Sequence, residues 1–280
     1  MSSKLSRLDF LRYSALGAST MILPRAVSAA VAPKKPKKGD VNDKINIGFI
    51  GLGQQAIHLV SGFLTIPEVR VIAGCDVYDI KRDRFVNRVN KYYGEQGIKN
   101  KLDMYIKFED LLARPDIDAV VIATPDHQHA RIAIAACKAG KDIYLEKPLT
   151  FTIYEGQRLI EAVRANNRIL QVGSMQRSMA EFIHAANIVR EGRLGKISLI
   201  HAYVGEGPKP YTLPKQEVPA GLDWDLWLGP LADTWHYNHE LNPLITANGG
   251  DECWGAWRWY QGLGGGFTTD WGAHMFDIAQ

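Results

Sequence analysis

The sequence predicts an α/β fold built on a doubly wound parallel sheet, and three observations support this prediction. A Gly-x-Gly-x-x-Ala pattern, from Gly51 to Ala56, lies between an apolar run and an apolar-periodic segment, which indicates a strand, a tight turn and a helix. Residues 118–123 form a continuous, largely β-branched run, typical of a strand covered by helices on both faces. Strand and helix patterns then alternate along the chain, as a parallel sheet requires.

The remaining elements follow from local signals. A helix is predicted over 129–139, where Gly140 ends it, and another over 152–166, where Thr152 and Glu155 form a capping box. Apolar or β-branched runs place five strands, at residues 44–50, 69–75, 118–123, 142–145 and 168–172. Residues 168–172 are predicted to close the sheet as a sixth strand, so the residues of one strand are not assigned. These elements define a first domain over residues 41–174 and leave residues 175–280 for a second.

The glycine pattern predicts a dinucleotide-binding turn. Gly51 allows the chain to reverse sharply, Gly53 lets the backbone approach a pyrophosphate, and Ala56 lets helix and strand pack closely. A phosphate would then bind at the helix N-terminus. Leu52 and Gln54 belong to the same turn, so both are candidate cofactor-binding residues.

Asp76 ends the second predicted strand, 25 positions after Gly51. An acidic residue near this spacing binds a ribose 2′-hydroxyl. Because its carboxylate repels a 2′-phosphate, Asp76 favours NAD over NADP. Lys81 and Arg82 follow closely and could reach a phosphate, so NADP stays an alternative.

Composition and charge narrow the function classes. The 280 residues are 46% hydrophobic and 22% charged, as in an ordinary globular chain long enough for two domains. The net charge is +3, but residues 1–40 hold eight Lys or Arg and only two acids, leaving 25 basic and 28 acidic residues in the rest. The body of the chain therefore gives no case for nucleic-acid binding.

Residues 1–40 predict an export signal followed by a basic linker. Basic residues precede a modest apolar stretch over 13–23, and small residues follow it. Residues 6–12 resemble a twin-arginine signal in which Leu8 replaces the second arginine. The apolar stretch is short and broken, and no later segment is long enough to cross a bilayer. We expect an exported, periplasmic protein without a membrane span.

Neither a disulfide framework nor a metal site is predicted. Cys75, Cys137 and Cys253 are an odd number in separate segments, and the first two suit small apolar positions in a core. The histidines and acids between residues 236 and 252 match no specific zinc spacing and are interpreted as polar loop residues.

Two loops at strand ends are predicted to carry the chemistry, because ligands of open α/β sheets bind outside the carboxyl ends of the strands. One loop covers residues 124–129 and the other is Glu146-Lys147-Pro148. A lysine there, beside a carboxylate, suits hydroxyl binding or proton relay next to a nicotinamide, while a surface lysine is the alternative. The loops add these candidates for cofactor binding: Thr124, Pro125, His127, His129, Glu146 and Lys147.

Beyond the two loops, the sequence has the motifs Gly173-x-x-Gln176-Arg177, Trp224 to Pro230 and Asp270 to His274. With these motifs in place, the sequence resembles the glucose-fructose oxidoreductase and inositol dehydrogenase family, Gfo/Idh/MocA, over about residues 44–280. The resemblance implies a Rossmann domain followed by an α/β domain with an open sheet, NAD(P) in the crevice, and a sugar or cyclitol substrate. It also implies an exported subgroup with similar leaders. The motifs that carry it are Gly51-Leu52-Gly53, Asp76, Ala123-Thr124-Pro125 with His129, Glu146-Lys147-Pro148, Gly173-x-x-Gln176-Arg177, Trp224 to Pro230 and Asp270 to His274.

Members of this family continue well past the Asp270 to His274 motif. We therefore expect this chain to hold only the N-terminal part of the second, substrate domain, which makes that domain incomplete. Family members commonly assemble through the second domain's sheet, so the resemblance also implies a homo-oligomer for the full-length protein.

The family's catalytic pattern carries over to Lys147, Asp270 and His274. Asp270 and His274 are four positions apart, so on one helix they share a face, where the carboxylate could orient the imidazole. We predict His274 as the general base in the oxidising direction and Lys147 as the group that holds the substrate hydroxyl and stabilises negative charge. A structural histidine is the alternative interpretation of His274.

Aromatic residues favour a carbohydrate pocket in the second part of the chain. All seven tryptophans lie after residue 223, and their faces suit sugar rings, although core packing is expected for most of them. Tyr203, on a strand predicted over 197–204, is a candidate substrate-binding residue, together with Gln176 and Arg177.

Three functions fit these observations. The first is a dehydrogenase acting on a sugar or cyclitol hydroxyl. The second is a glycosidase that uses NAD transiently and shows no net redox change. The third is a non-catalytic fragment that binds a sugar or nucleotide.

Overall fold

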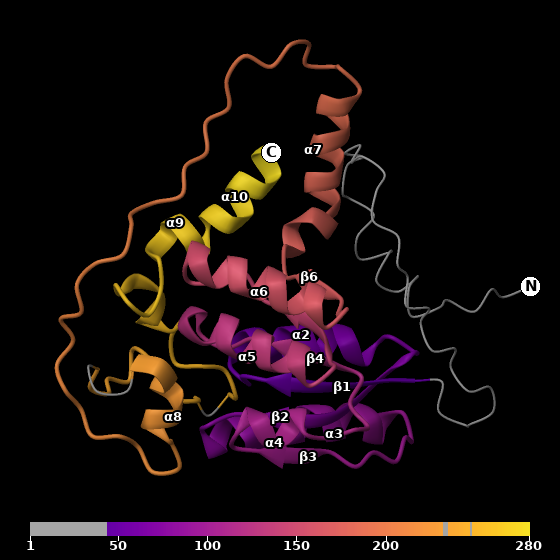
Figure 1. Ribbon diagram of the computed structural model, residues 1–280, viewed down its shortest axis with the longest axis vertical. Helices are drawn as coiled ribbons and strands as arrows, with labels where there is room; N and C mark the ends of the chain where they lie inside the picture. Colours follow the sequence, from indigo (N-terminus) through magenta and orange to yellow (C-terminus); the bar gives the residue numbers. More distant parts are fainter. Residues whose placement is uncertain (1–43, 232–234, 247) are drawn as a thin grey trace, which may run out of the picture.

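The computed structural model describes residues 44–231, 235–246 and 248–280 (Figure 1). The predicted export signal and linker, residues 1–40, lie outside the described residues.

Six parallel strands form one sheet in the order β3-β2-β1-β4-β5-β6. This order confirms the predicted doubly wound sheet, whose direction of winding reverses between β1 and β4. The short strand β3 is the one that the sequence did not locate. The strands are β1 (Ile45–Ile50), β2 (Val69–Cys75), β3 (Asp103–Tyr105), β4 (Ala119–Ile122), β5 (Asp142–Leu145) and β6 (Leu170–Val172).

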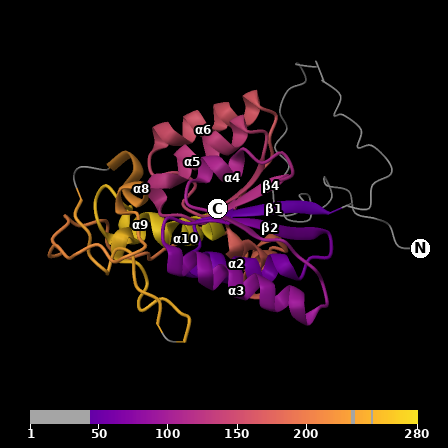
Figure 2. The same ribbon diagram turned by 90° about the horizontal axis from the view of Figure 1, so that it is seen from below.

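Helices cover both faces of the sheet (Figure 2). One face carries α2 (Gln54–Leu64) and α3 (Asp79–Glu95), and the other carries α4 (Phe108–Leu112), α5 (Asp126–Lys138) and α6 (Ile153–Ala165). Each face has its own buried apolar cluster, one around Phe49 and Phe85 and one around Leu145 and Leu159. A sheet buried on both sides in this way explains the continuous apolar runs of its strands.

Helix boundaries agree with the local signals where capping is strong. Thr152 is the N-cap of α6 and both hydrogen bonds of the predicted capping box are present. Helix α5 begins at Asp126, three residues before the predicted start, because Pro125 provides its extended N-cap.

The rest of the chain, from residue 175 on, is assembled from short helices. Its elements are η1 (Met175–Ser178), α7 (Ala180–Arg190), α8 (Trp224–Leu228), η2 (Gly229–Leu231), η3 (Ala256–Trp259), α9 (Gly266–Asp270) and α10 (Gly272–Ala279). A third apolar cluster joins α8 and η3 to the loop after β2 through Tyr78, Trp224, Trp227 and Trp257. Core packing is thus confirmed for these three tryptophans, whereas Trp254 and Trp271 are exposed.

The strand predicted over 197–204 is wrong. This segment runs around the outside of the molecule between α7 and α8 without regular structure (Figure 1). No described segment pairs with it as a strand, and a lone strand would leave its backbone N–H and C=O groups without partners.

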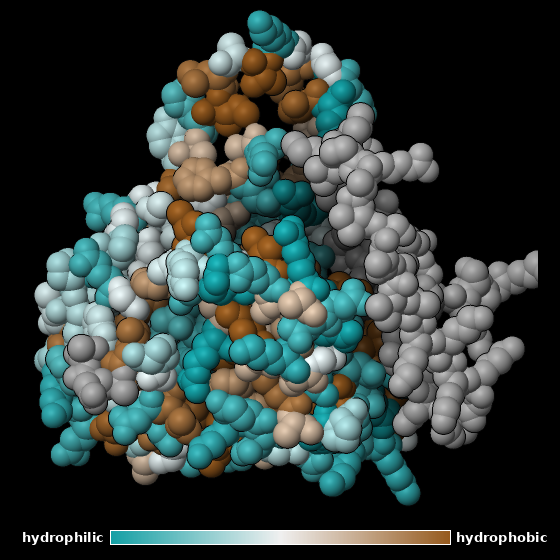
Figure 3. All heavy atoms as spheres, viewed as in Figure 1, coloured by the Kyte–Doolittle hydropathy of each residue, from teal (hydrophilic) through white to brown (hydrophobic). Residues whose placement is uncertain are grey.

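The end of α7 and the segment after it expose apolar side chains, which gather at the top of the molecule in Figure 3. Val189, Leu194, Leu199 and Ile200 are among the exposed residues. Of the helices in the described residues, none has both the length and the apolar character needed to cross a bilayer.

Candidate active site and cofactor cleft

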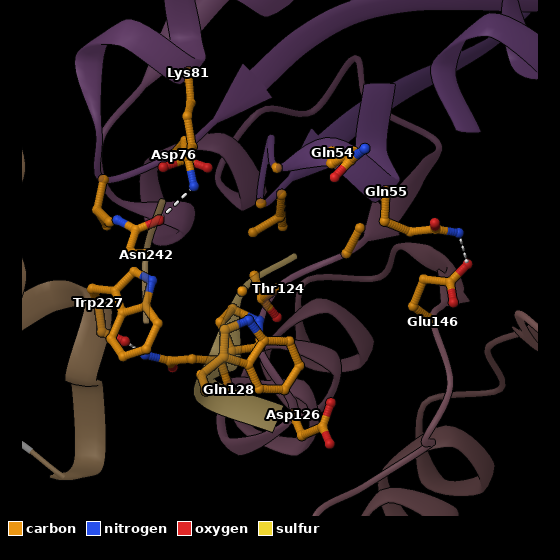
Figure 4. Close-up of a pocket in the computed structure, with 18 of the residues that line it drawn as sticks. Gln54, Gln55, Asp76, Lys81, Thr124, Asp126, Gln128, Glu146, Trp227 and Asn242 are labelled. Atoms are coloured by element: carbon orange, nitrogen blue, oxygen red, sulfur yellow. Dashed lines mark hydrogen bonds between the residues drawn. The ribbon is translucent and has the colours of Figure 1, made fainter. Parts of the chain in front are cut away.

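A cleft of about 340 Å³ lies at the carboxyl ends of β1, β2, β4 and β5 (Figure 4). Residues of the Rossmann sheet and residues of the second part of the chain line it together. This is the place where open α/β sheets bind their ligands.

The glycine turn forms one end of the cleft. Gly51 has φ +80°, and a Cβ there would lie 2.8 Å from the Ala123 backbone, so the position requires glycine. Gly53 lines the cleft, and a Cβ added to it would meet no atom within 4 Å. Helix α2 follows directly, and its N-cap residue, Gly53, has no side chain to bond the first N–H groups of the helix. The turn therefore leaves open space and free donors where a pyrophosphate would bind.

Asp76 is held rigidly at the end of β2. Its Oδ2 accepts a hydrogen bond from Leu52 N at 2.7 Å, and its Oδ1 accepts one from Tyr78 N at 2.9 Å. Asp76 lines the cleft, whereas the Leu52 side chain is fully buried behind the turn. A fixed carboxylate in this position fits recognition of ribose hydroxyls.

The two cations that could have favoured NADP are engaged elsewhere. Lys81 is buried, and its Nζ donates a hydrogen bond to Asn242 Oδ1. Arg82 Nη1 donates to the backbone oxygen of Asp76 at 2.6 Å. Burial also lowers the pKa of Lys81. Neither side chain is therefore fully available to a 2′-phosphate.

The loop after β4 brings Thr124 and Pro125 to the cleft but not His127 or His129. His129 is buried behind it, with Nδ1 2.7 Å from Pro148 O and Nε2 3.0 Å from Thr124 O. It thus lies between the two predicted loops, and a neutral imidazole donates a hydrogen bond to only one of these two oxygens. His127 Nε2 lies 3.1 Å from the backbone oxygen of Trp227. Burial lowers the pKa of both histidines to about 4, so both are neutral at pH 7.

Glu146 lies at the wall of the cleft opposite Asp76 and Lys81 (Figure 4). Its Oε1 accepts hydrogen bonds from Gln55 Nε2 at 3.0 Å and Tyr144 Oη at 3.3 Å, and burial raises its pKa. A Cβ at Gly173 would lie 2.8 Å from the same oxygen, which explains why the chain needs glycine there. The Lys147–Pro148 peptide is cis.

Lys147 and Asp270 form a partly buried ion pair, with Nζ 2.5 Å from Oδ1. The same oxygen lies 3.4 Å from Arg258 Nε, so one carboxylate serves two cations. The Arg258 guanidinium lies 4.2 Å from the ring centre of Trp254 and 4.1 Å from that of Trp257. All five side chains line the cleft. Their arrangement holds the ammonium group of Lys147 in a fixed place in the cleft.

His274 lines the cleft next to this ion pair, but the predicted contact with Asp270 is wrong. Asp270 ends α9 while His274 belongs to α10, and the Asp270 carboxylate turns to Lys147 instead. His274 Nδ1 is buried and has no hydrogen-bond partner among the described residues. Burial, and then the charge of Lys147, lower the pKa of His274. Its imidazole is therefore neutral at pH 7 and able to accept a proton.

Three cleft residues were missed as site candidates from the sequence. Asp126 is 3% exposed, and burial raises its pKa to about 8, so its carboxyl group is neutral at pH 7. The position of Asp126 in the predicted loop over 124–129 was the sequence signal that could have identified it as a site residue. Arg258 was detectable as one charge within a run of aromatic residues, while Gln55 and its bond to Glu146 carried no local signal.

The predicted substrate residues lie outside the cleft. Arg177 forms a two-bond ion pair with Asp277, at 2.5 and 2.6 Å, which docks η1 on α10. Gln176 lies beside it in η1, and Tyr203 is 86% exposed on the outer segment. The aromatic rings that do line the cleft are those of Phe108, Trp227, Trp254, Trp257 and Trp271.

Part of this chain is similar to known proteins. The model of an oxidoreductase family with an NAD-binding Rossmann fold, Gfo/Idh/MocA, matches residues 45–174. Inositol 2-dehydrogenase of Salmonella typhimurium is 29% identical over 180 residues, covering 64% of this chain and 50% of that protein. A glycosyl hydrolase family 109 protein of Shewanella pealeana is 32% identical over 222 residues, covering 72% of this chain and 47% of that protein.

Among solved structures, apo scyllo-inositol dehydrogenase from Lactobacillus casei at 77 K aligns with a TM-score of 0.50 and 27% identity, covering 60% of this chain and 47% of that one. The chain spans about half the length of the curated relatives it matches. The glycine turn, Asp76 and the Glu146-Lys147-Pro148 loop all lie within the matched residues 45–174. Through this domain, the chain belongs to the Gfo/Idh/MocA oxidoreductase family.

Proposed function

We propose that the protein is an NAD-dependent dehydrogenase that transfers hydride between nicotinamide and a hydroxyl-bearing carbon of a sugar or cyclitol. The observation that carries the proposal is one cleft that joins a pyrophosphate-type glycine turn and Asp76 to the Lys147–Asp270 ion pair and His274. The similarity to inositol 2-dehydrogenase supports a polyhydroxylated substrate.

Different residues of the cleft have different roles in the proposed reaction. Gly51, Gly53 and the N-terminus of α2 would hold the pyrophosphate, and Asp76 would hold the ribose. When bound, the nicotinamide supplies a hydride acceptor. Lys147, fixed by Asp270, binds the substrate oxygen and stabilises the negative charge that develops there, while the neutral imidazole of His274 takes up the hydroxyl proton.

Asp76, with Lys81 and Arg82 already engaged, supports NAD as the cofactor over NADP. The sequence of residues 1–40 supports export to the periplasm. Family resemblance supports a homo-oligomer of the full-length protein.

A second candidate is a glycoside hydrolase, which the similarity to the family 109 protein supports. In this route a ring hydroxyl is oxidised transiently, the neighbouring C–H loses its proton, the aglycone is eliminated, water adds, and the ketone is reduced again. Electrons are returned in the last step, so no NADH accumulates.

The test begins with the nucleotide released from denatured protein after purification in buffer without nucleotide. NADH formation and aglycone release are then measured with cyclitols, sugars and aryl glycosides. Accumulation of NADH supports the dehydrogenase, and aglycone release without NADH selects the hydrolase. Nucleotide binding without either reaction would contradict both and leave a binding protein.

A variant tests the role of the proposed base. His274→Ala should lower turnover by a factor on the order of 10² to 10⁴ with NAD affinity unchanged, because only the proton acceptor is lost. His184→Ala, which alters an exposed histidine of α7, is the matched control and should keep full turnover. Full turnover of His274→Ala would leave His274 as a structural residue.

A further inference from the structure

A segment of the second part of the chain crosses the end of the cleft that the glycine turn and Asp76 form. We call its described residues, 241–246 and 248–255, the strap. Leu241, Asn242, Pro243, Asp251 and Trp254 of the strap line the cleft together with the glycine turn and Asp76. The nucleotide site is therefore bounded by the Rossmann domain on one side and by the strap on another.

Arg84 of α3 ties the strap to the glycine turn. Its Nη1 lies 2.5 Å from Asp251 Oδ1 and 3.2 Å from Gly249 O, both in the strap. Its Nη2 donates to Leu52 O, in the glycine turn, at 2.9 Å. The Arg84 and Asp251 side chains are only 11% and 8% exposed. One buried guanidinium thus holds two structures that face each other across the nucleotide site.

Asn242 forms the second anchor and offers an unused donor. Lys81 Nζ can only donate, so the amide oxygen of Asn242 must face it and the orientation of the amide is fixed. Asn242 Nδ2 is then left buried, with no hydrogen-bond partner among the described residues. Figure 4 shows this amide between Asp76 and Trp227, in the part of the cleft where the ribose would bind. A buried amide N–H without a partner is costly, unless a ligand supplies an acceptor.

We propose that the strap is a cofactor clamp: Asn242 Nδ2 donates a hydrogen bond to a ribose oxygen of the dinucleotide, and the Arg84–Asp251 ion pair must open before the dinucleotide can enter or leave. The inference rests on the proposed function only in that it requires a dinucleotide in the cleft. It assigns to this chain slow cofactor exchange, controlled by two residues of the strap.

The ion pair is tested with Asp251→Ala, which removes the carboxylate of the pair but leaves the bonds from Arg84 to Leu52 O and to Gly249 O. NAD association and dissociation rate constants, measured by stopped-flow fluorescence, should both rise at least about tenfold, because a buried pair no longer has to break. Glu252→Ala, at the adjacent exposed carboxylate, is the matched control and should leave both rate constants unchanged.

The donor is tested with Asn242→Asp. A carboxylate keeps the contact with Lys81, as an ion pair, but replaces the N–H donor by an acceptor next to Asp76. NAD dissociation should accelerate about tenfold while association stays the same, because the strap remains anchored. Thermal unfolding of each variant checks that the fold is retained.

The outcomes separate the two proposals. If the wild-type protein binds no NAD, the proposed function fails. If it binds NAD and neither variant changes an exchange rate, the clamp is overturned and the proposed function remains. If Asp251→Ala unfolds, Asn242→Asp still decides whether the strap contacts the nucleotide. Faster NAD dissociation from Asn242→Asp supports the contact, and an unchanged rate overturns it.

Discussion

The two ends of the cleft are built in different ways. At the phosphate end, Gly51, Gly53 and Asp76 come from one β-strand, turn, helix and β-strand unit, and the groups proposed to bind phosphate are backbone N–H groups at the start of α2. At the ion-pair end, Lys147 and Asp270 are 123 positions apart and the groups are buried charged side chains. The phosphate end depends on local geometry, whereas the ion-pair end depends on docking of the two parts of the chain.

The largest effect is expected at the ion-pair end. Lys147→Met removes the ammonium group that touches Asp270 and leaves Arg258 beside that carboxylate. Turnover should fall by about 10³-fold, because the donor for the substrate oxygen is lost, while NAD affinity changes little. Steady-state kinetics and NAD titration check this result.

Lys138→Met serves as the control, because Lys138 is exposed at the end of α5. A turnover within tenfold of wild type for Lys147→Met would show that this end of the cleft does not carry the chemistry. A comparable loss of NAD affinity would show that the two ends are not separable.

The next effect is expected at the phosphate end. Gly53→Val places a branched side chain in the open space beside the turn, where a Cβ meets no protein atom. The fold should persist, but NAD affinity should fall by about 100-fold, because the side chain occupies the space of the pyrophosphate. Gly62→Val, on the exposed side of the same helix α2, is the matched control. Equal affinities of both variants would place the phosphates elsewhere.

This difference between the two ends also explains what the sequence could predict. Most strands, the glycine turn, the position of Asp76 at the end of β2 and the α6 capping box have signals in residues close in sequence, and the structure has them at the predicted places. The ligand groups that Gly51, Gly53 and Asp76 would bind stay a prediction. The third strand, β3, has only three residues and lacks a periodic signal. The strand predicted over 197–204 failed because a local pattern cannot supply the neighbour that a strand must pair with.

At the ion-pair end, local spacing was misleading. Asp270 and His274 are four positions apart, but a break between α9 and α10 separates them, and Lys147 takes the carboxylate. Arg258 and Asn242 reach the cleft only because the third apolar cluster docks the second part of the chain near β2. No pattern in a single sequence encodes such a long-range arrangement.

A smaller effect is expected between the two ends, where His129 lies between the loops after β4 and β5. Burial lowers the pKa of His129 to about 4, below the value of about 6.5 for an exposed imidazole. Between these values the unfolded chain binds a proton that the folded chain excludes. The His129 contribution to stability is therefore fully present above about pH 6.5 and is lost as the pH falls towards 4.

The comparison with His129→Gln isolates this contribution. The difference in the free energy of unfolding between wild type and variant should shrink by about 1 kcal/mol per pH unit between pH 6.5 and 4. Asp126, whose pKa burial raises to about 8, acts in the opposite sense, but it is present in both proteins and cancels. Urea unfolding at several pH values measures the difference. A difference independent of pH would mean that His129 is protonated in the folded chain.

The smallest effect is expected far from both ends. Thr152→Ala removes the capping box of α6, in which Thr152 Oγ1 accepts from Glu155 N and Glu155 Oε2 accepts from Thr152 N. The free energy of unfolding should fall by about 1 kcal/mol, with NAD affinity and turnover unchanged. Glu161→Ala, which removes only an exposed ion pair of the same helix, should cost less than about 0.5 kcal/mol. Weaker NAD binding or lower turnover of Thr152→Ala would mean that the α6 face of the sheet is coupled to the cleft. Nucleotide binding at the phosphate end would then not depend on its local turn alone.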